Sequence, residues 1–217
     1  MRIRTFTGGG FGENAYLAVC DSTSACVAVD PGAGAAMLEQ YIEEEGLDLK
    51  AILLTHAHLD HVEGISDVRA RHPSVPIWLH PDDLNLYRGV QQQAAMFGLA
   101  VDPQPEPTDE LIPGEPFHFG DCTFEVLFAP GHSPGHVVFV SQEDSLALVG
   151  DVVFEGSIGR TDLPGGSFET LMASIQREIL SLPDETTLFP GHGPTTSVGQ
   201  ERKTNPFLVP HYGGGLV

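Results

Sequence analysis

The sequence has little positive charge. Lysine and arginine together number 10 against 30 aspartate and glutamate residues, which gives a formal net charge of −20, and the only lysines are Lys50 and Lys203. A surface with this charge repels phosphate groups and anionic lipid headgroups. We therefore expect that the partner of this protein is neither a nucleic acid nor a membrane surface.

Cysteine is also scarce, and long apolar runs are missing. The three cysteines, Cys20, Cys26 and Cys122, form no C-x-x-C pair, which disfavours a cysteine-rich zinc site. Cys20 and Cys26 flank a probable turn and could face each other, but free thiols and a cytoplasmic location are the expectation. No stretch approaches the ~20 apolar residues that a membrane-spanning helix needs, and no secretory signal is recognisable.

The length of 217 residues and the hydrophobic content of 41% fit one domain with a sizeable core, so we predict a single domain over residues 1–217. Strand-like and helix-like stretches alternate, which predicts the α/β class. Residues 101–116 are rich in proline and acidic residues and are interpreted as a surface loop. Together with a helix expected over residues 81–97, this loop forms either a lid over a site (residues 81–116) or a plain connection.

Histidine, in contrast, is concentrated in one short stretch. Residues 55–61 read Thr-His-Ala-His-Leu-Asp-His, directly after the apolar run 51–54, which is typical of a buried strand that ends in a loop. His56 and His58 are two residues apart, so extended backbone points both to one side, where they can bind one ion. Asp60 and His61 point elsewhere and suit a second, neighbouring ion. A polar surface run or a single structural zinc ion is the alternative, but imidazole is a preferred ligand of zinc and similar metals.

Three more candidate ligands stand at predicted strand ends, each beside glycine. They are His132, Asp151 and His192. Glycine and proline at these places let the backbone approach closely and fix the loops. We predict that His132 binds the first ion, that His192 binds the second, and that Asp151 bridges both through its two oxygens.

Three other residues receive different predictions. His136 begins the next strand and is expected to be buried outside the ligand set, and His80 has a similar status. Asp30 follows an apolar strand and is expected either to orient a ligand histidine through a hydrogen bond or to be an ordinary turn residue.

The motif H-A-H-L-D-H at residues 56–61, followed by His132, Asp151 and His192, resembles the metallo-β-lactamase superfamily. Every ligand position of the dinuclear hydrolases in that superfamily has a match, and the resemblance covers nearly the whole chain. It implies a four-layer αβ/βα sandwich with two divalent metal ions at one edge. Zinc is the first expectation for these ions, with iron or manganese as alternatives.

Within the superfamily, residues 131–136, 150–154 and 158–162 look most like the glyoxalase II branch, whose members hydrolyse S-acylglutathione thioesters, chiefly S-lactoylglutathione. Longer members carry a C-terminal helical domain whose basic residues hold glutathione. Here only 25 residues follow His192, and their only cations are Arg202 and Lys203. The chain therefore resembles a short type that lacks this domain.

We hypothesise hydrolysis of a small-molecule thioester such as S-lactoylglutathione, with a hydroxide that bridges two metal ions as the nucleophile. Asp60 is expected to bind metal and to orient this hydroxide, which makes it the catalytic residue. Arg160 and Tyr87 are candidate substrate contacts, although an ion pair between Arg160 and Asp162 is the competing interpretation for the arginine.

Other functions remain open from the sequence. Residues 160–162 also resemble persulfide dioxygenases, which use a single iron at the positions matching His56, His132 and Asp151. A lactone or β-lactam hydrolase of the same superfamily is a further alternative, as is a protein that holds metal without turnover. Structural zinc sites are usually closed and rich in cysteine, which disfavours the last. A homo-oligomer also stays open.

Overall fold

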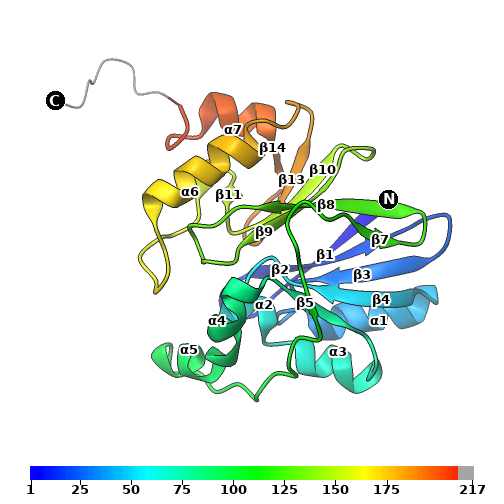
Figure 1. Cartoon of the computed structure of the whole chain (residues 1–217). Helices are drawn as coiled ribbons and strands as arrows, with labels where there is room; N and C mark the ends of the chain where they lie inside the picture. The colour runs from blue at the N-terminus through cyan, green and yellow to red at the C-terminus, as the bar shows by residue number, and fades with distance from the viewer. Residues whose placement is uncertain (210–217) are drawn as a thin grey trace.

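Two six-stranded sheets lie at the centre of the computed structural model (Figure 1). The first sheet has the order β1 (Arg2–Gly8), β2 (Glu13–Val19), β3 (Ala25–Val29), β4 (Asp48–Leu53), β5 (Ile77–Leu79), β6 (Asp109–Glu110). The second has the order β14 (Thr196–Ser197), β13 (Thr187–Pro190), β10 (Leu146–Gly150), β9 (Val137–Ser141), β8 (Cys122–Phe128), β7 (Phe117–Phe119). A short hairpin is formed by β11 (Val153–Phe154) and β12 (Ser157–Ile158). The structure describes residues 1–209, so the last part of the predicted domain, residues 210–217, lies outside the described residues.

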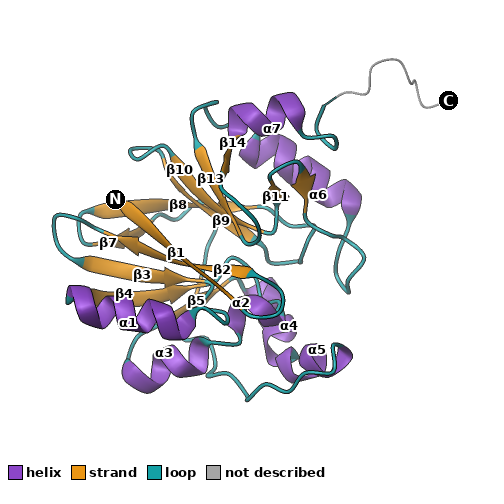
Figure 2. Cartoon of the chain, turned by 180° about the vertical axis from the view of Figure 1, so that it is seen from behind, coloured by secondary structure: helices purple, strands orange, loops and turns teal. Residues whose placement is uncertain are grey.

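Helices cover the two outer faces of this pair of sheets (Figure 2). The first sheet is covered by α1 (Ala35–Glu45) and α3 (Ile65–Arg71), and the second by α6 (Phe168–Ser174) and α7 (Val198–Thr204). The remaining helices are α2 (Leu59–Val62), α4 (Leu84–Arg88) and α5 (Val90–Met96), with a 3₁₀ turn (Pro81–Asp83) before α4 and a π-helical turn (Ile175–Ile179) after α6. No helix within residues 1–209 is long and apolar enough to cross a membrane.

Three apolar layers hold the sheets and helices together. The inner layer joins the facing sides of the two sheets through residues such as Val27, Phe124 and Phe139. One outer layer packs α1 and α3 on the first sheet, and the other packs α6 on the second. Burial of apolar surface contributes roughly 25 cal/mol per Å², so each layer is a separate source of stability. This is the four-layer αβ/βα sandwich that the sequence resemblance implied.

Strand direction places several loops at one edge of the sandwich. The pairs β3–β4, β4–β5 and β10–β13 are parallel, so the loops that follow these strands leave from the same edge of their sheet. Those loops begin with Asp30 after β3, Leu54 after β4 and Asp151 after β10. The loop of Asp30 leads into α1, which is capped by Gly46, whose φ of 61° is the left-handed conformation that glycine adopts readily.

The cysteine expectation can also be checked. Cys20, Cys26 and Cys122 are all free. Cys20 accepts a hydrogen bond from the backbone N–H of Asp121 at 3.3 Å, so it faces the turn between β7 and β8. All three lie away from the predicted ligands, as the sequence suggested.

Candidate metal centre

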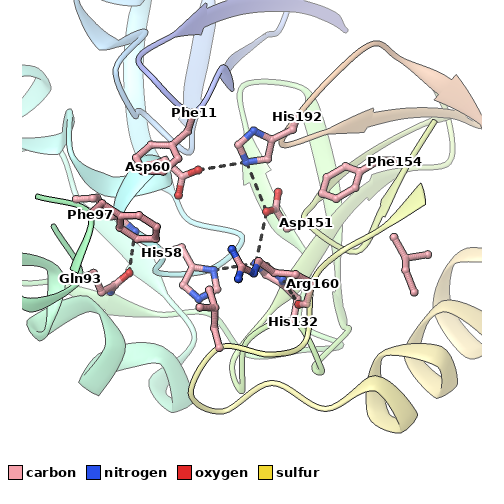
Figure 3. Close-up of a pocket in the computed structure, with 13 residues that line it drawn as sticks. Phe11, His58, Asp60, Gln93, Phe97, His132, Asp151, Phe154, Arg160 and His192 are labelled. Carbon is pink, nitrogen blue, oxygen red and sulfur yellow. Dashed lines mark hydrogen bonds and ion pairs between the residues drawn. The ribbon is translucent and has the colours of Figure 1, made fainter. Parts of the chain in front are cut away.

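The predicted ligands meet at one edge of the sandwich, although they come from distant parts of the chain (Figure 3). The loop after β4 and α2 carry His56, His58, Asp60 and His61, the loop between β8 and β9 carries His132, and the loops after β10 and β13 carry Asp151 and His192. The structure therefore brings the whole predicted set together.

Two groups of three ligand atoms can be separated. His56, His58 and His132 place one nitrogen each within 4.8 Å of one another, and His58 Nδ1 lies 2.8 Å from His132 Nε2. Asp60, His61 and His192 form the second group by the same measure, and Asp60 Oδ2 lies 3.2 Å from His192 Nε2. Each group can surround one ion.

Asp151 lies between the two groups. Its Oδ1 is 3.4 Å from His61 Nε2, and its Oδ2 is 3.4 Å from His132 Nε2 and 3.5 Å from His192 Nε2. One carboxylate therefore faces histidines of both groups. A ligand that bridges two ions would need this position, and the bridging role of Asp151 stays a prediction.

Unpaired buried atoms point to the group that would complete this site. His56 Nε2, His58 Nε2, His61 Nε2 and Asp151 Oδ1 are buried without a hydrogen-bond partner among the described residues. A buried polar atom without a partner costs about 1–3 kcal/mol, so several such atoms in one place need an explanation. Imidazole nitrogens and carboxylate oxygens are ligands of zinc, iron and manganese. The donor set therefore fits a pair of divalent metal ions.

Burial keeps most of these imidazoles neutral, as metal binding requires. Burial lowers the pKa of His58 to about 3 and the pKa of His56 far below its usual range. His61 differs, because Asp151 and Asp60 outweigh the effect of burial and raise its pKa well above the usual value. The same contact lowers the pKa of Asp151 despite its burial.

Asp30 has the orienting role that the sequence analysis considered. Its Oδ1 accepts a hydrogen bond from the Thr55 N–H at 2.7 Å, and its Oδ2 accepts one from the Thr55 hydroxyl at 2.6 Å. Oδ2 also lies 3.0 Å from His61 Nδ1. Since a carboxylate only accepts, this contact places the proton on Nδ1 and leaves Nε2 of His61 free to bind metal. Asp30, His56 and His61 also form a close group, but hydrogen bonds already occupy both Asp30 oxygens.

Asp83 is a residue of this site that the sequence analysis missed. It is fully buried and accepts hydrogen bonds from the Ala57 N–H at 3.0 Å, the Ser133 hydroxyl at 2.7 Å and the Gly135 N–H at 2.5 Å. Burial raises the pKa of this carboxyl despite the three donors. Asp83 thus ties the loop of His56 and His58 to the loop of His132.

Two residues of β2 were also missed. The Asn14 side chain donates to the carbonyl oxygens of Pro190 and Gly193 at 3.0 and 2.9 Å, and the Tyr16 hydroxyl donates to Pro190 at 2.6 Å. These bonds hold both ends of the loop that carries His192. The motif 14–16 was visible in the sequence, but nothing in it identified a partner more than 170 positions away.

The histidines expected outside the ligand set are indeed buried beside it. His136 Nε2 accepts a hydrogen bond from the Asp151 N–H at 3.1 Å, and its ring stacks on that of His56. His80 accepts from the Asp82 N–H and stacks on Phe128. Neither residue belongs to the two groups of candidate ligands.

A cavity of about 330 Å³ opens over the centre. His58, Asp60, His132, Asp151 and His192 lie on its floor. The other lining residues are mainly apolar: Phe11, Leu59, Phe97, Phe154, Ile158 and Leu163, with Gln93 and Arg160 as the polar ones. Gln93 and Phe97 come from the segment 81–116 that the sequence analysis considered as a lid. Whether this segment moves stays a prediction.

The two predicted substrate contacts have different positions. Arg160 lines the cavity, and its guanidinium donates two hydrogen bonds to Asp162, at 2.7 and 2.8 Å. Tyr87 is buried, and its hydroxyl donates to the Pro105 carbonyl at 2.6 Å. It lines a separate cavity beside Arg88. The structure does not bring Tyr87 to the metal centre, so we withdraw it as a substrate contact; its apolar ring packs into the core.

Comparisons with known proteins agree with this geometry. A family model described as the metallo-beta-lactamase superfamily matches residues 8–192. The hydroxyacylglutathione hydrolase GloC of Haemophilus influenzae is 40% identical over 216 residues, which covers 96% of this chain and 98% of that protein. The crystal structure of TTHA1623 in a di-iron-bound form has a TM-score of 0.87 at 44% identity, and the match covers 94% of this chain and 100% of that chain. The crystal structure of the BLEG-1 B3 metallo-beta-lactamase has a TM-score of 0.88 at 38% identity, and the match covers 96% of this chain and 100% of that chain.

Proposed function

This chain belongs to the metallo-β-lactamase superfamily and is a metal-dependent hydrolase of it, and from that premise we propose that it cleaves thioesters of the S-lactoylglutathione type. The observation that carries the proposal is that donor atoms of both ligand groups line a single open cavity. A closed structural site would have no such opening. The similarity to the GloC hydrolase supports a thioester as the substrate.

We assign His56, His58 and His132 to one ion and Asp60, His61 and His192 to the other, with Asp151 shared. Zinc is the first candidate, and the di-iron form of TTHA1623 makes iron the next. When bound, such ions supply a water nucleophile at neutral pH and a positive charge that polarises the carbonyl group.

The residues of the chain supply position and proton transfer. Asp60 faces the cavity and is held by His192 at 3.2 Å, so its carboxylate is placed to orient the attacking water and to accept its proton. The departing thiol needs little help, because free thiols have pKa values near ~8.5 and leave readily as thiolates. A site without a strong general acid at the leaving group is therefore sufficient for a thioester.

A panel assay tests this proposal. Fully metal-loaded protein is assayed against S-lactoylglutathione, other thioesters, a lactone and a β-lactam, and its metal content is measured on the same batch. We expect thioester cleavage with about two metal ions per chain, and loss of activity after chelation that returned metal restores. Failure of the metal-loaded protein to cleave any thioester would refute the proposal.

A second candidate is β-lactam hydrolysis, favoured by the 38% identity to the BLEG-1 metallo-beta-lactamase. It predicts that β-lactams are cleaved at least as efficiently as thioesters in the same panel. Oxygen uptake with glutathione persulfide and a single bound iron would instead identify a persulfide dioxygenase.

A further inference from the structure

The cavity over the metal centre has almost no polar group left for a charged substrate. Gln93 is one of its two polar side chains outside the ligand set. Its amide N–H groups donate to the carbonyl oxygens of Ala57 and Leu86 at 3.1 and 2.9 Å, and its carbonyl oxygen accepts from the Leu59 N–H at 3.0 Å. Gln93 therefore braces the wall of the cavity and has no free donor.

Arg160 is the other polar side chain, and it is engaged as well. Its two hydrogen bonds to Asp162 form a parallel fork, which is the geometry in which a guanidinium binds a carboxylate best. The fork uses the Nε–H and one hydrogen of Nη2, and the charge of Asp162 offsets that of the guanidinium, which weakens its attraction for a substrate carboxylate. Arg160 is also the only lysine or arginine that lines this cavity within residues 1–209.

The basic residues near the end of the chain do not provide a partner for a charged substrate either. Arg202 and Lys203 both contact Asp184, and neither lines the cavity. The sequence after residue 209 contains no lysine or arginine. Glutathione carries two carboxylates, and the only lysine or arginine that lines the cavity within residues 1–209 is already paired with Asp162.

Aromatic rings surround the opening instead. Phe11, from the loop between β1 and β2, and Phe97, after α5, contact each other edge to face, with ring centroids 5.2 Å apart. Figure 3 shows both rings beside Asp60 and Gln93, with Phe154 across the cavity. Phe11 is 37% exposed and Phe97 is 48% exposed. Covering this apolar surface with an apolar group of a ligand is favourable.

Building on the thioester hydrolysis proposed above, we propose that the preferred substrates carry an uncharged thiol part with an apolar or aromatic group that packs against Phe11 and Phe97. The acyl group must reach the metal centre on the floor of the cavity, so the thiol part lies along the walls. Phe11 and Phe97 then determine specificity for the leaving thiol, and glutathione is a poor fit.

Three thioesters with the same lactoyl group test this inference. They are the thioesters of glutathione, of N-acetylcysteamine and of N-benzoylcysteamine, which differ in charge and in an aromatic ring but share the bond that breaks. We expect a KM for the benzoyl compound about tenfold below that of the acetyl compound. We expect the glutathione compound to have the highest KM of the three, with similar kcat for all.

Two variants and a matched control locate the effect. Phe11→Ala and Phe97→Ala should each reduce the preference for the benzoyl over the acetyl compound from about tenfold to about threefold or less. Phe168→Ala, at an exposed phenylalanine that does not line the cavity, should keep the full preference. Calorimetry with the corresponding S-methyl thioethers, which cannot be hydrolysed, should give the same order of dissociation constants.

The outcomes separate this inference from the proposed function. A lowest KM for S-lactoylglutathione, or an unchanged preference in both phenylalanine variants, would overturn the inference and leave thioester hydrolysis intact. If metal-loaded protein cleaves none of the three compounds, the proposed function fails. The thioether dissociation constants would then still decide whether the walls select an apolar group.

Discussion

The metal centre and the mouth of the cavity above it are built in opposite ways. In the centre, five of the seven candidate ligands are buried, Asp60 and His192 are partly buried, and other buried side chains hold them: Asp30 fixes His61, and Asp83 joins the loops of His56 and His132. At the mouth, Phe11 and Phe97 are exposed and contact each other. From this difference we infer that the proposed reaction depends on the buried network, whereas substrate choice depends on a few exposed side chains at the mouth.

The largest effect is expected from Asp60→Asn in the centre. The amide has nearly the same shape as the carboxylate, but it cannot accept a proton and binds metal less well. We expect kcat for S-lactoylglutathione to fall by about 10²–10⁴-fold, while KM changes by about threefold or less. Steady-state kinetics with saturating metal, together with metal analysis, measure this change.

Asp121→Asn is the matched control for Asp60→Asn. Asp121 is exposed and bonds to Ser22 at the opposite end of the sheets, so kcat should match that of the unmodified protein. An Asp60→Asn variant that keeps its rate would remove Asp60 from the proposed catalytic role.

Asp30→Asn tests how far the metal centre depends on the residue that orients the ligand His61. Asp30 has a φ of 49°, which asparagine tolerates well, so the backbone should not be disturbed. The amide has one accepting oxygen instead of two, so its NH2 group must face either the Thr55 N–H or the pair formed by the Thr55 hydroxyl and His61 Nδ1, and the fixed orientation of His61 is weakened. We expect about a 10–100-fold loss of metal affinity, measured by titration against a chelator.

Thr55→Ser keeps both donors to Asp30 and should retain nearly normal metal affinity. If Asp30→Asn binds metal as tightly as the unmodified protein, the buried network is not what holds the centre in place.

The sequence predicted the centre much better than its surroundings. Histidine and aspartate at strand ends beside glycine indicate metal ligands, because few other roles need these residues in that pattern. The strand predicted before the histidine motif, over residues 51–54, corresponds to β4. These features can be predicted because they depend on residues that are close to one another in the sequence.

Residues that act through distant contacts could not be found in this way. Asp83 looks like an acidic residue at the start of a helix, but its partner Gly135 is 52 positions away. Phe11 and Phe97 resemble any other apolar residue until the fold places them side by side. The helix expected over residues 81–97 is divided at Gly89 into α4 and α5, and Gln93 of α5 and Phe97 just after it line the cavity.

A smaller effect is expected from Asp162→Asn at the mouth of the cavity. Arg160 lowers the pKa of Asp162 to about 2, so the pair is charged at neutral pH. The substitution frees the guanidinium for a substrate carboxylate. We expect KM for S-lactoylglutathione to fall by up to about fivefold, the range of exposed ion pairs, with no change for the uncharged N-acetylcysteamine thioester. An equal change for both thioesters would show that Arg160 does not discriminate charge.

The smallest effect is expected at Glu39, a buried carboxylate away from both regions. Its side chain is 2% exposed, one oxygen lies 3.2 Å from His72 Nε2, and the other has no partner. Burial raises its pKa, and His72 only partly offsets this. Because the folded protein binds this proton more tightly than the unfolded chain, the charged form destabilises the fold at pH values above the raised pKa.

Glu39→Gln removes that charge without changing the size of the side chain. Its melting temperature should exceed that of the unmodified protein near neutral pH by about 2–4 °C, equivalent to roughly 1 kcal/mol in a chain of this size. The difference should vanish as the pH falls through the raised pKa towards ~4.3, the usual value for glutamate. Thermal melts at several pH values measure this difference, and metal affinity should be unaffected. A loss of metal affinity would mean that a buried carboxylate on α1 also supports the centre, against the contrast between the buried centre and the rest of the molecule.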